Sequence, residues 1–117
     1  MLPIATITEG DDVIWFLPLK LDGAVPETIA DWEVWVTGKQ SATQADSAAA
    51  FQLSTGNGRI TVYDDANGLA RVHLLPEHTL GLGGLKLACD VQVRRPGPLT
   101  STALRFFLKI EPQITRA

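Results

Sequence analysis

The sequence has one cysteine, Cys89, one methionine and one tyrosine in 117 residues. A single cysteine excludes an intrachain disulfide and fits folding in a reducing cytoplasm. Long apolar runs are also absent, because the longest near the N-terminus, VIWFLPL over 13–19, is far too short to cross a bilayer. No basic segment precedes it, so no secretory signal is readable. We therefore expect a protein that folds without disulfides and has no membrane partner.

Motifs that bind phosphate or calcium are missing from the polar stretch STGNGRITVYDDANG, residues 54–68. A phosphate loop needs a lysine and a hydroxyl after its last glycine, whereas Gly58 precedes Arg59 and an isoleucine. An EF-hand alignment on Gly68 would place Tyr63 and Leu74 at ligand positions, and neither side chain binds calcium. We interpret both Asn-Gly pairs as turns that need positive φ, and we expect no cofactor and no metal.

Catalytic groupings are equally scarce. No G-x-S-x-G elbow occurs, and the two histidines, His73 and His78, fall in different local patterns. Cys89 lies on the apolar face of its strand, where cysteine is usually an inert core residue. The carboxylate pairs occur in turns, where aspartate serves the backbone. The chain is therefore not expected to be an enzyme.

The charge is low and unevenly distributed. Ten Lys and Arg against 13 Asp and Glu give −3, which does not favour nucleic-acid binding. Residues 1–33 carry seven acids and one lysine, hence −6, whereas residues 94–117 carry five cations and one acid, hence +4. The two ends either pair within one fold or form complementary faces between subunits.

Period-two alternation dominates, and no stretch has a sustained helical period. We expect seven or eight short strands, from the segments 4–8, 13–21, 31–39, 51–55, 59–63, 69–75, 85–95 and 102–110. The turn PEHTLG, over 76–81, has a proline to begin one short helical turn and a glycine to end it. The spacing predicts an all-β antiparallel sandwich of seven to eight strands, one domain over 1–117, with a mobile loop at about 39–50.

Alternation also predicts which residues face the core. In LKLACDVQVRR, over 85–95, the apolar residues share one face and the charged residues the other. The strand from residue 13 contains Pro18, which restricts it to a sheet edge or a bulge.

Aromatic residues exceed what one face of each strand can bury. Val13, Trp15 and Leu17 occupy one face of their strand, which leaves Ile14 and Phe16 on the other. Exposed aromatics of this kind mark protein interfaces. The candidate interface residues are Trp15, Phe16, Trp35, Phe107, Arg105 and Lys109. Coverage of these aromatics by loops or the 76–81 turn is the alternative.

The segments FQLSTGNGRITVYDDANGLARVHLLPEHT, LKLACDVQVRR and the terminal EPQITR resemble a group of small tailed-bacteriophage virion proteins. The sequence is also similar to the immunoglobulin-like N-terminal domain of phage baseplate upper proteins. The resemblance covers residues 31–117 and implies an immunoglobulin-like sandwich present in many copies on a phage particle. It transfers no catalytic residues.

The resemblance implies a structural protein of the tail or baseplate, or an adaptor for fibre attachment, located in the virion after assembly in the host cytoplasm. Its partners would be other virion proteins, with the chain as a homo-oligomer or in a multi-copy assembly. Two alternatives stay open: a capsid decoration protein, and a carbohydrate-binding or host-adhesion module in which Trp15 or Trp35 stacks on a sugar.

Overall fold

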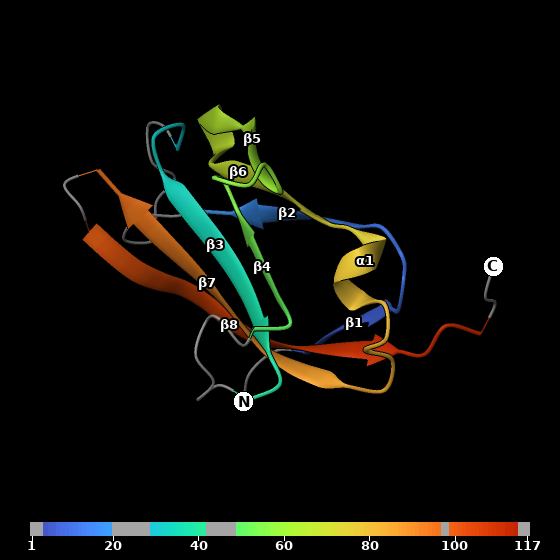
Figure 1. Cartoon of the computed structure of the whole chain (residues 1–117). Helices are drawn as coiled ribbons and strands as arrows, with labels where there is room; N and C mark the ends of the chain where they lie inside the picture. The colour runs from blue at the N-terminus through green and yellow to red at the C-terminus, as the bar shows by residue number, and fades with distance from the viewer. Residues whose placement is uncertain (1–3, 20–28, 42–48, 97–98, 115–117) are drawn as a thin grey trace.

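The computed structural model describes residues 4–19, 29–41, 49–96 and 99–114. These residues form two packed β-sheets (Figure 1). The strands are β1 Ile4–Thr8, β2 Val13–Pro18, β3 Glu33–Lys39, β4 Phe51–Ser54, β5 Ile60–Asp64, β6 Leu69–Leu74, β7 Lys86–Arg95 and β8 Leu99–Glu111. The predicted helical turn is confirmed as α1, Pro76–Thr79, and a 3-10 turn η2, Asp65–Asn67, was not anticipated.

The strand order is that of an immunoglobulin-like sandwich. One sheet has the order β2-β6-β5 and the other the order β1-β8-β7-β3-β4. These correspond to the B-E-D strands and to the G-F-C strands extended by C′. The predicted all-β sandwich is therefore confirmed. No strand of the described chain occupies the strand-A position beside β2, so β2 is an edge strand, as Pro18 predicted.

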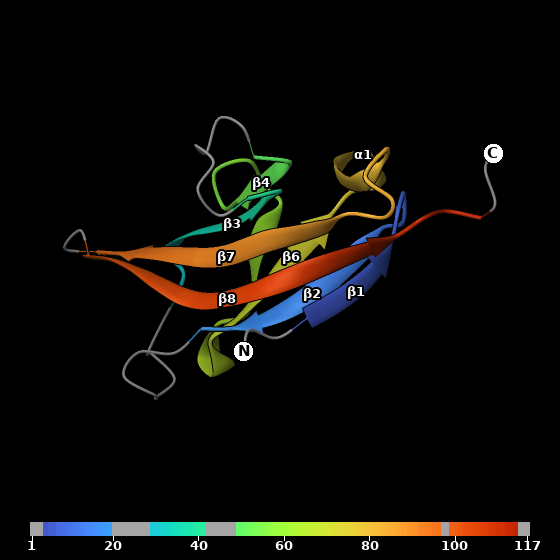
Figure 2. The same ribbon diagram turned by 90° about the horizontal axis from the view of Figure 1, so that it is seen from below.

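The strand pairs are antiparallel except β1 with β8, which run parallel. A parallel pair needs a long crossover only when its strands follow each other in one sheet. Here the chain passes from β1 to β2 in the opposite sheet, and it forms β8, the neighbour of β1, only as its last strand. The parallel pair thus places the first strand beside the last strand (Figure 2).

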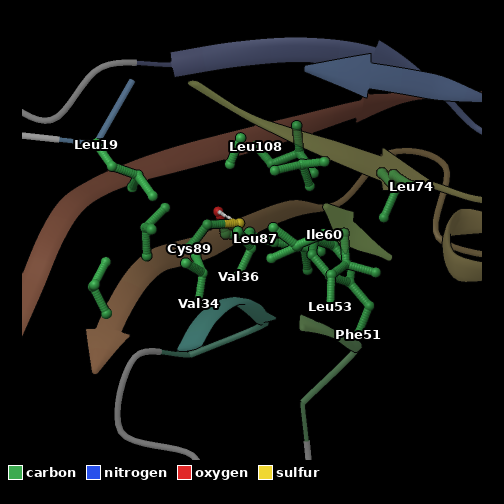
Figure 3. Close-up of a cluster of buried hydrophobic side chains, with 14 of the residues drawn as sticks. Leu19, Val34, Val36, Phe51, Leu53, Ile60, Leu74, Leu87, Cys89 and Leu108 are labelled. Carbon is green, nitrogen blue, oxygen red and sulfur yellow. Dashed lines mark hydrogen bonds between the residues drawn. The ribbon is translucent and has the colours of Figure 1, made fainter. Parts of the chain in front are cut away.

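The core lies between the sheets and follows the predicted alternation. On β7, the residues from Leu87 to Val93 alternate between buried inward side chains and more exposed outward ones. Leu108 and Ile110 of β8 complete this layer from the neighbouring strand. The close-up in Figure 3 shows Cys89 among these buried side chains, where its thiol contacts the Leu87 carbonyl oxygen at 3.9 Å.

The two Asn-Gly pairs make turns, as the sequence predicted. Gly58 has φ of 80° and Gly68 has φ of 66°, conformations that cost other residues more. The Asn57 side chain accepts hydrogen bonds from the amides of Ser54 and Arg59, at 3.0 and 3.1 Å. The polar stretch therefore forms turns whose side chains hydrogen-bond to the backbone of the turn itself.

One end of the sandwich is joined by a buried carboxylate. Glu9, only 2% exposed, follows β1 and accepts from the amides of Gly81 at 2.5 Å and Gln113 at 3.2 Å. The hydroxyl of Thr79 accepts from the amide of Gly10 at 2.9 Å. These contacts fix α1 and the residues after β8 to the turn between β1 and β2.

The structure corrects one expectation, the start of the last strand, and another falls on residues that it does not describe. β8 begins at Leu99, before the predicted start, and carries a bulge because Val91 pairs with Leu104 while Gln92 pairs with Thr102. The predicted mobile loop at about 39–50 falls largely on residues 42–48, which lie outside the described residues.

Candidate functional site

The six candidate interface residues occupy three separate places. Trp35, Arg105, Phe107 and Lys109 lie on the outer face of the five-stranded sheet. Phe16 lies on the outer face of the opposite sheet. Trp15 points inward, with its ring edge-on to Phe106 at 6.2 Å. The fold therefore does not unite the six residues in one site, and their role stays a prediction.

The outer face of the five-stranded sheet has partners within the chain. The Lys86 ammonium lies 4.7 Å from the centre of the Phe107 ring, and Lys109 forms an ion pair with Glu111 at 3.5 Å. Arg105 lies opposite Asp90 in the strand register, and Trp35 is half-buried. Phe107 and Lys109 therefore each have a charged partner within the chain.

The outer face of the three-stranded sheet carries an exposed apolar cluster. Ile14 is 44% exposed, Phe16 51% and Tyr63 61%, and the two aromatic rings lie 4.5 Å apart. Sequence reasoning missed Tyr63. Its exposed position follows from a bulge between Val62 and Asp64, which changes the strand's pairing and which the local sequence pattern does not indicate. We call these three residues the β2 cluster.

An apolar groove opens beside this cluster, between the edges of the two sheets. Its volume is about 310 Å³. Its lining includes residues of β1, β2 and β8, namely Ile4, Ala5, Trp15, Leu17, Leu104 and Phe106, and core valines of β3, β6 and β7. We call this feature the edge groove.

The backbone of β2 also has a free side. The Leu19 amide donates to the Gly68 carbonyl oxygen at 2.8 Å, so this pair is hydrogen-bonded. In an antiparallel ladder such pairs alternate, which assigns Val13, Trp15 and Leu17 to the bonds with β6. The amides and carbonyls of Ile14 and Phe16, and the carbonyl of Pro18, therefore point away from β6. No strand of the described residues pairs with these groups, so they form an unpaired strand edge along the edge groove.

The two histidines and the cysteine make contacts that belong to the fold. His73 contacts Asp12 at 2.9 Å, whereas Nδ1 of His78 accepts from the Leu75 amide at 2.8 Å. Burial lowers the pKa of His78, and burial followed by the charge of Asp90 raises the pKa of Cys89 to about 12. A buried thiol held neutral is a poor nucleophile.

Metal and membrane features can be stated for the described ranges. Within residues 4–19, 29–41, 49–96 and 99–114, no three His, Cys, Asp or Glu side chains gather as a metal-binding group. In the same ranges, no helix combines the length and apolar character needed to span a bilayer.

The opposite charges of the two chain ends pair only in part. Glu33 faces Arg94 across β3 and β7, so one acid of the first 33 residues lies beside a late cation. The buried Glu9 instead accepts hydrogen bonds from backbone amides, and Asp12 pairs with His73.

The scan against protein-family models finds no match to this chain, and the search of curated proteins finds none.

Proposed function

We propose that this chain is a non-enzymatic structural protein of a tailed-bacteriophage virion, an immunoglobulin-like building block of the tail or baseplate or an adaptor for fibres. It docks onto neighbouring virion proteins. The observation that carries the docking role is the β2 cluster beside the edge groove and the unpaired edge of β2. The virion setting rests on the sequence resemblance.

Docking fits the chemistry of this surface. Exposed aromatic and aliphatic side chains beside a concave apolar site are typical of protein interfaces, where a few large residues carry most of the binding energy. Phe16 and Tyr63 form such a pair, with Ile14 on the same strand face as Phe16. The groups that could serve in catalysis are committed elsewhere: Cys89 to the core and His78 to a backbone amide.

A carbohydrate-binding role is the second candidate, and one observation favours it. Trp15 packs against Phe106 and Trp35 is half-buried, so neither presents a free ring face to a sugar. The exposed Phe16–Tyr63 pair supplies an aromatic platform instead. A capsid decoration protein is a variant of the first proposal that uses the same docking surface.

The test measures incorporation into particles. In purified phage particles made with the wild-type chain, peptide mass spectrometry should find it at a fixed copy number. Phe16→Glu should weaken docking about ten-fold or more, because it places a charge in an apolar contact. Leu80→Glu is the matched control, since Leu80 is 62% exposed and lies outside the β2 cluster.

Either variant should unfold at a temperature close to that of wild type, because both residues are exposed. If the wild-type chain is absent from particles, or Phe16→Glu enters them like Leu80→Glu, the proposal fails. Glycan binding by the purified chain that is lost in Phe16→Glu would support the carbohydrate role instead.

A further inference from the structure

The edge groove has the properties of a site for an added β-strand. Ile14 and Phe16 each present an unpaired amide and carbonyl, and Pro18 presents a carbonyl, over about 13 Å of strand. Apolar side chains of β1, β2 and β8 line the space beside this edge. An extended segment bound there would gain main-chain hydrogen bonds and an apolar pocket together, as in strand-addition complexes.

The segment after β8 supplies an apolar residue that is almost fully exposed. Ile114 is 98% exposed, the highest exposure among the large apolar residues described. Figures 1 and 2 show the chain leaving the end of β8 and pointing away from the sandwich. Gln113 and Ile114 are the described residues of this segment, and Ile114 is the large apolar side chain that it offers.

Ile114 cannot reach the groove of its own molecule. The amide of Gln113 is held by the buried Glu9 carboxylate at 3.2 Å, which fixes the start of the segment at the end of β8. The β8 side of the groove consists of Leu104 and Phe106. Phe106 lies five residues before Glu111, about 16 Å along the strand, whereas Ile114 is one residue past the anchor.

We propose that the segment beginning at Gln113 of one copy adds as a strand to the edge of β2 in a second copy, with Ile114 in the edge groove. The contact is heterologous, because a segment of one copy meets a groove of the next. Repetition gives a ring or an open chain. The inference deepens the proposed function by naming a partner, and it rests on that function only for the virion setting.

Analytical ultracentrifugation of the full chain tests this arrangement. The wild type should associate in a concentration-dependent manner. Ile114→Glu damages the donated segment and Ile4→Glu damages the groove rim, where Ile4 is 56% exposed. Each should raise the dissociation constant about ten-fold or more. Leu80→Glu should associate like wild type, and thermal unfolding should be unchanged in all three, because the altered residues are exposed.

Mixing the two defective variants gives the decisive measurement. Ile4→Glu retains an intact segment and Ile114→Glu an intact groove, so a mixture should form a heterodimer that grows no further. A wild type that stays monomeric, a mixture that stays monomeric, or unchanged association in Ile114→Glu would overturn the proposal. Loss of association in Ile4→Glu alone would indicate edge-to-edge pairing of two β2 strands and would also overturn it.

Incorporation into particles separates this inference from the proposed function. A chain that is monomeric in solution but enters particles through Phe16 contradicts the strand exchange and leaves the docking role intact. A chain that exchanges strands but is absent from particles contradicts the virion role alone.

Discussion

At the scale of single residues, a glycine on β3 is required by its neighbour. A Cβ added to Gly38 would lie 2.6 Å from Cζ of Phe51, whose ring is only 4% exposed and sits across the strand pair. Because the ring is confined by the core, it cannot move aside at low cost. The glycine thus makes room for the aromatic ring that covers it.

We predict that Gly38→Ala lowers the free energy of unfolding by about 1–3 kcal/mol through overpacking. Gly56→Ala is the matched control, since its added Cβ meets nothing nearer than the Ser54 hydroxyl oxygen at 3.7 Å. That variant should change stability by less than about 0.5 kcal/mol. Urea unfolding of both variants makes the comparison, and equal stabilities would show that the Phe51 ring yields.

His78 makes the free energy of unfolding depend on pH. Burial lowers the pKa of His78, with opposing influence from Glu77 and smaller lowering from Arg59 and His73. The unfolded state therefore binds the proton more readily than the folded state, so this contribution to stability is complete above the ordinary pKa of about 6.5. It is lost as the pH falls through the folded-state pKa. Protonation of Nδ1 also removes the bond from the Leu75 amide.

We predict that the free energy of unfolding falls between about pH 7.5 and about pH 5, and falls less in His78→Asn. Asparagine keeps an acceptor for the Leu75 amide and does not titrate. His73→Asn serves as the control, because His73 pairs with Asp12 at the surface. Denaturant titrations across this pH range measure the slopes. Equal slopes in wild type and His78→Asn would contradict the assignment.

At the scale of elements, β2 differs from its neighbours by having only one paired side. The alternation of its hydrogen bonds follows from the Leu19–Gly68 contact and leaves the Ile14 amide without a partner strand among the described residues. The Val13 amide falls on the side of β6. Substitution by proline, which lacks an amide hydrogen, therefore tests whether the amide at each position is hydrogen-bonded.

We predict that Ile14→Pro leaves the protein folded with a small loss of stability, whereas Val13→Pro costs about 2 kcal/mol or more. The second change removes a ladder hydrogen bond and disturbs a core-facing residue. Circular dichroism with thermal unfolding measures both. A larger loss from Ile14→Pro would reverse the assigned direction of the strand edge.

Most elements were predictable from local pattern. The faces of β7, the edge position of β2 and the proline-started turn α1 follow from alternation and from proline chemistry, which act over a few residues. The β8 bulge and the position of Tyr63 were not predictable, because both depend on which residues a neighbouring strand presents. The candidate site was therefore predicted only in part, through Phe16 and Trp15.

At the scale of the whole molecule, the parallel pairing of β1 with β8 sets the shape of the open side. It draws the first strand into the five-stranded sheet, so that among the described residues β2 is paired only with β6 and its other edge has no partner strand. The same pairing brings Glu9 beside Gln113, and the chain at Ile114 runs away from the sandwich (Figure 1). The strand exchange proposed above depends on this geometry.

The sequence by itself determined the fold class, the inward and outward residues of its strands and the two Asn-Gly turns. These depend on the two-residue period of a strand and on backbone sterics, both of which are local. Only the tertiary structure decided that Trp15 borders a groove, that one side of β2 has no partner strand in the described part of the chain and that Ile114 is almost fully exposed. These features arise from pairings between residues as distant as Ile4 and Phe107, which no local pattern encodes.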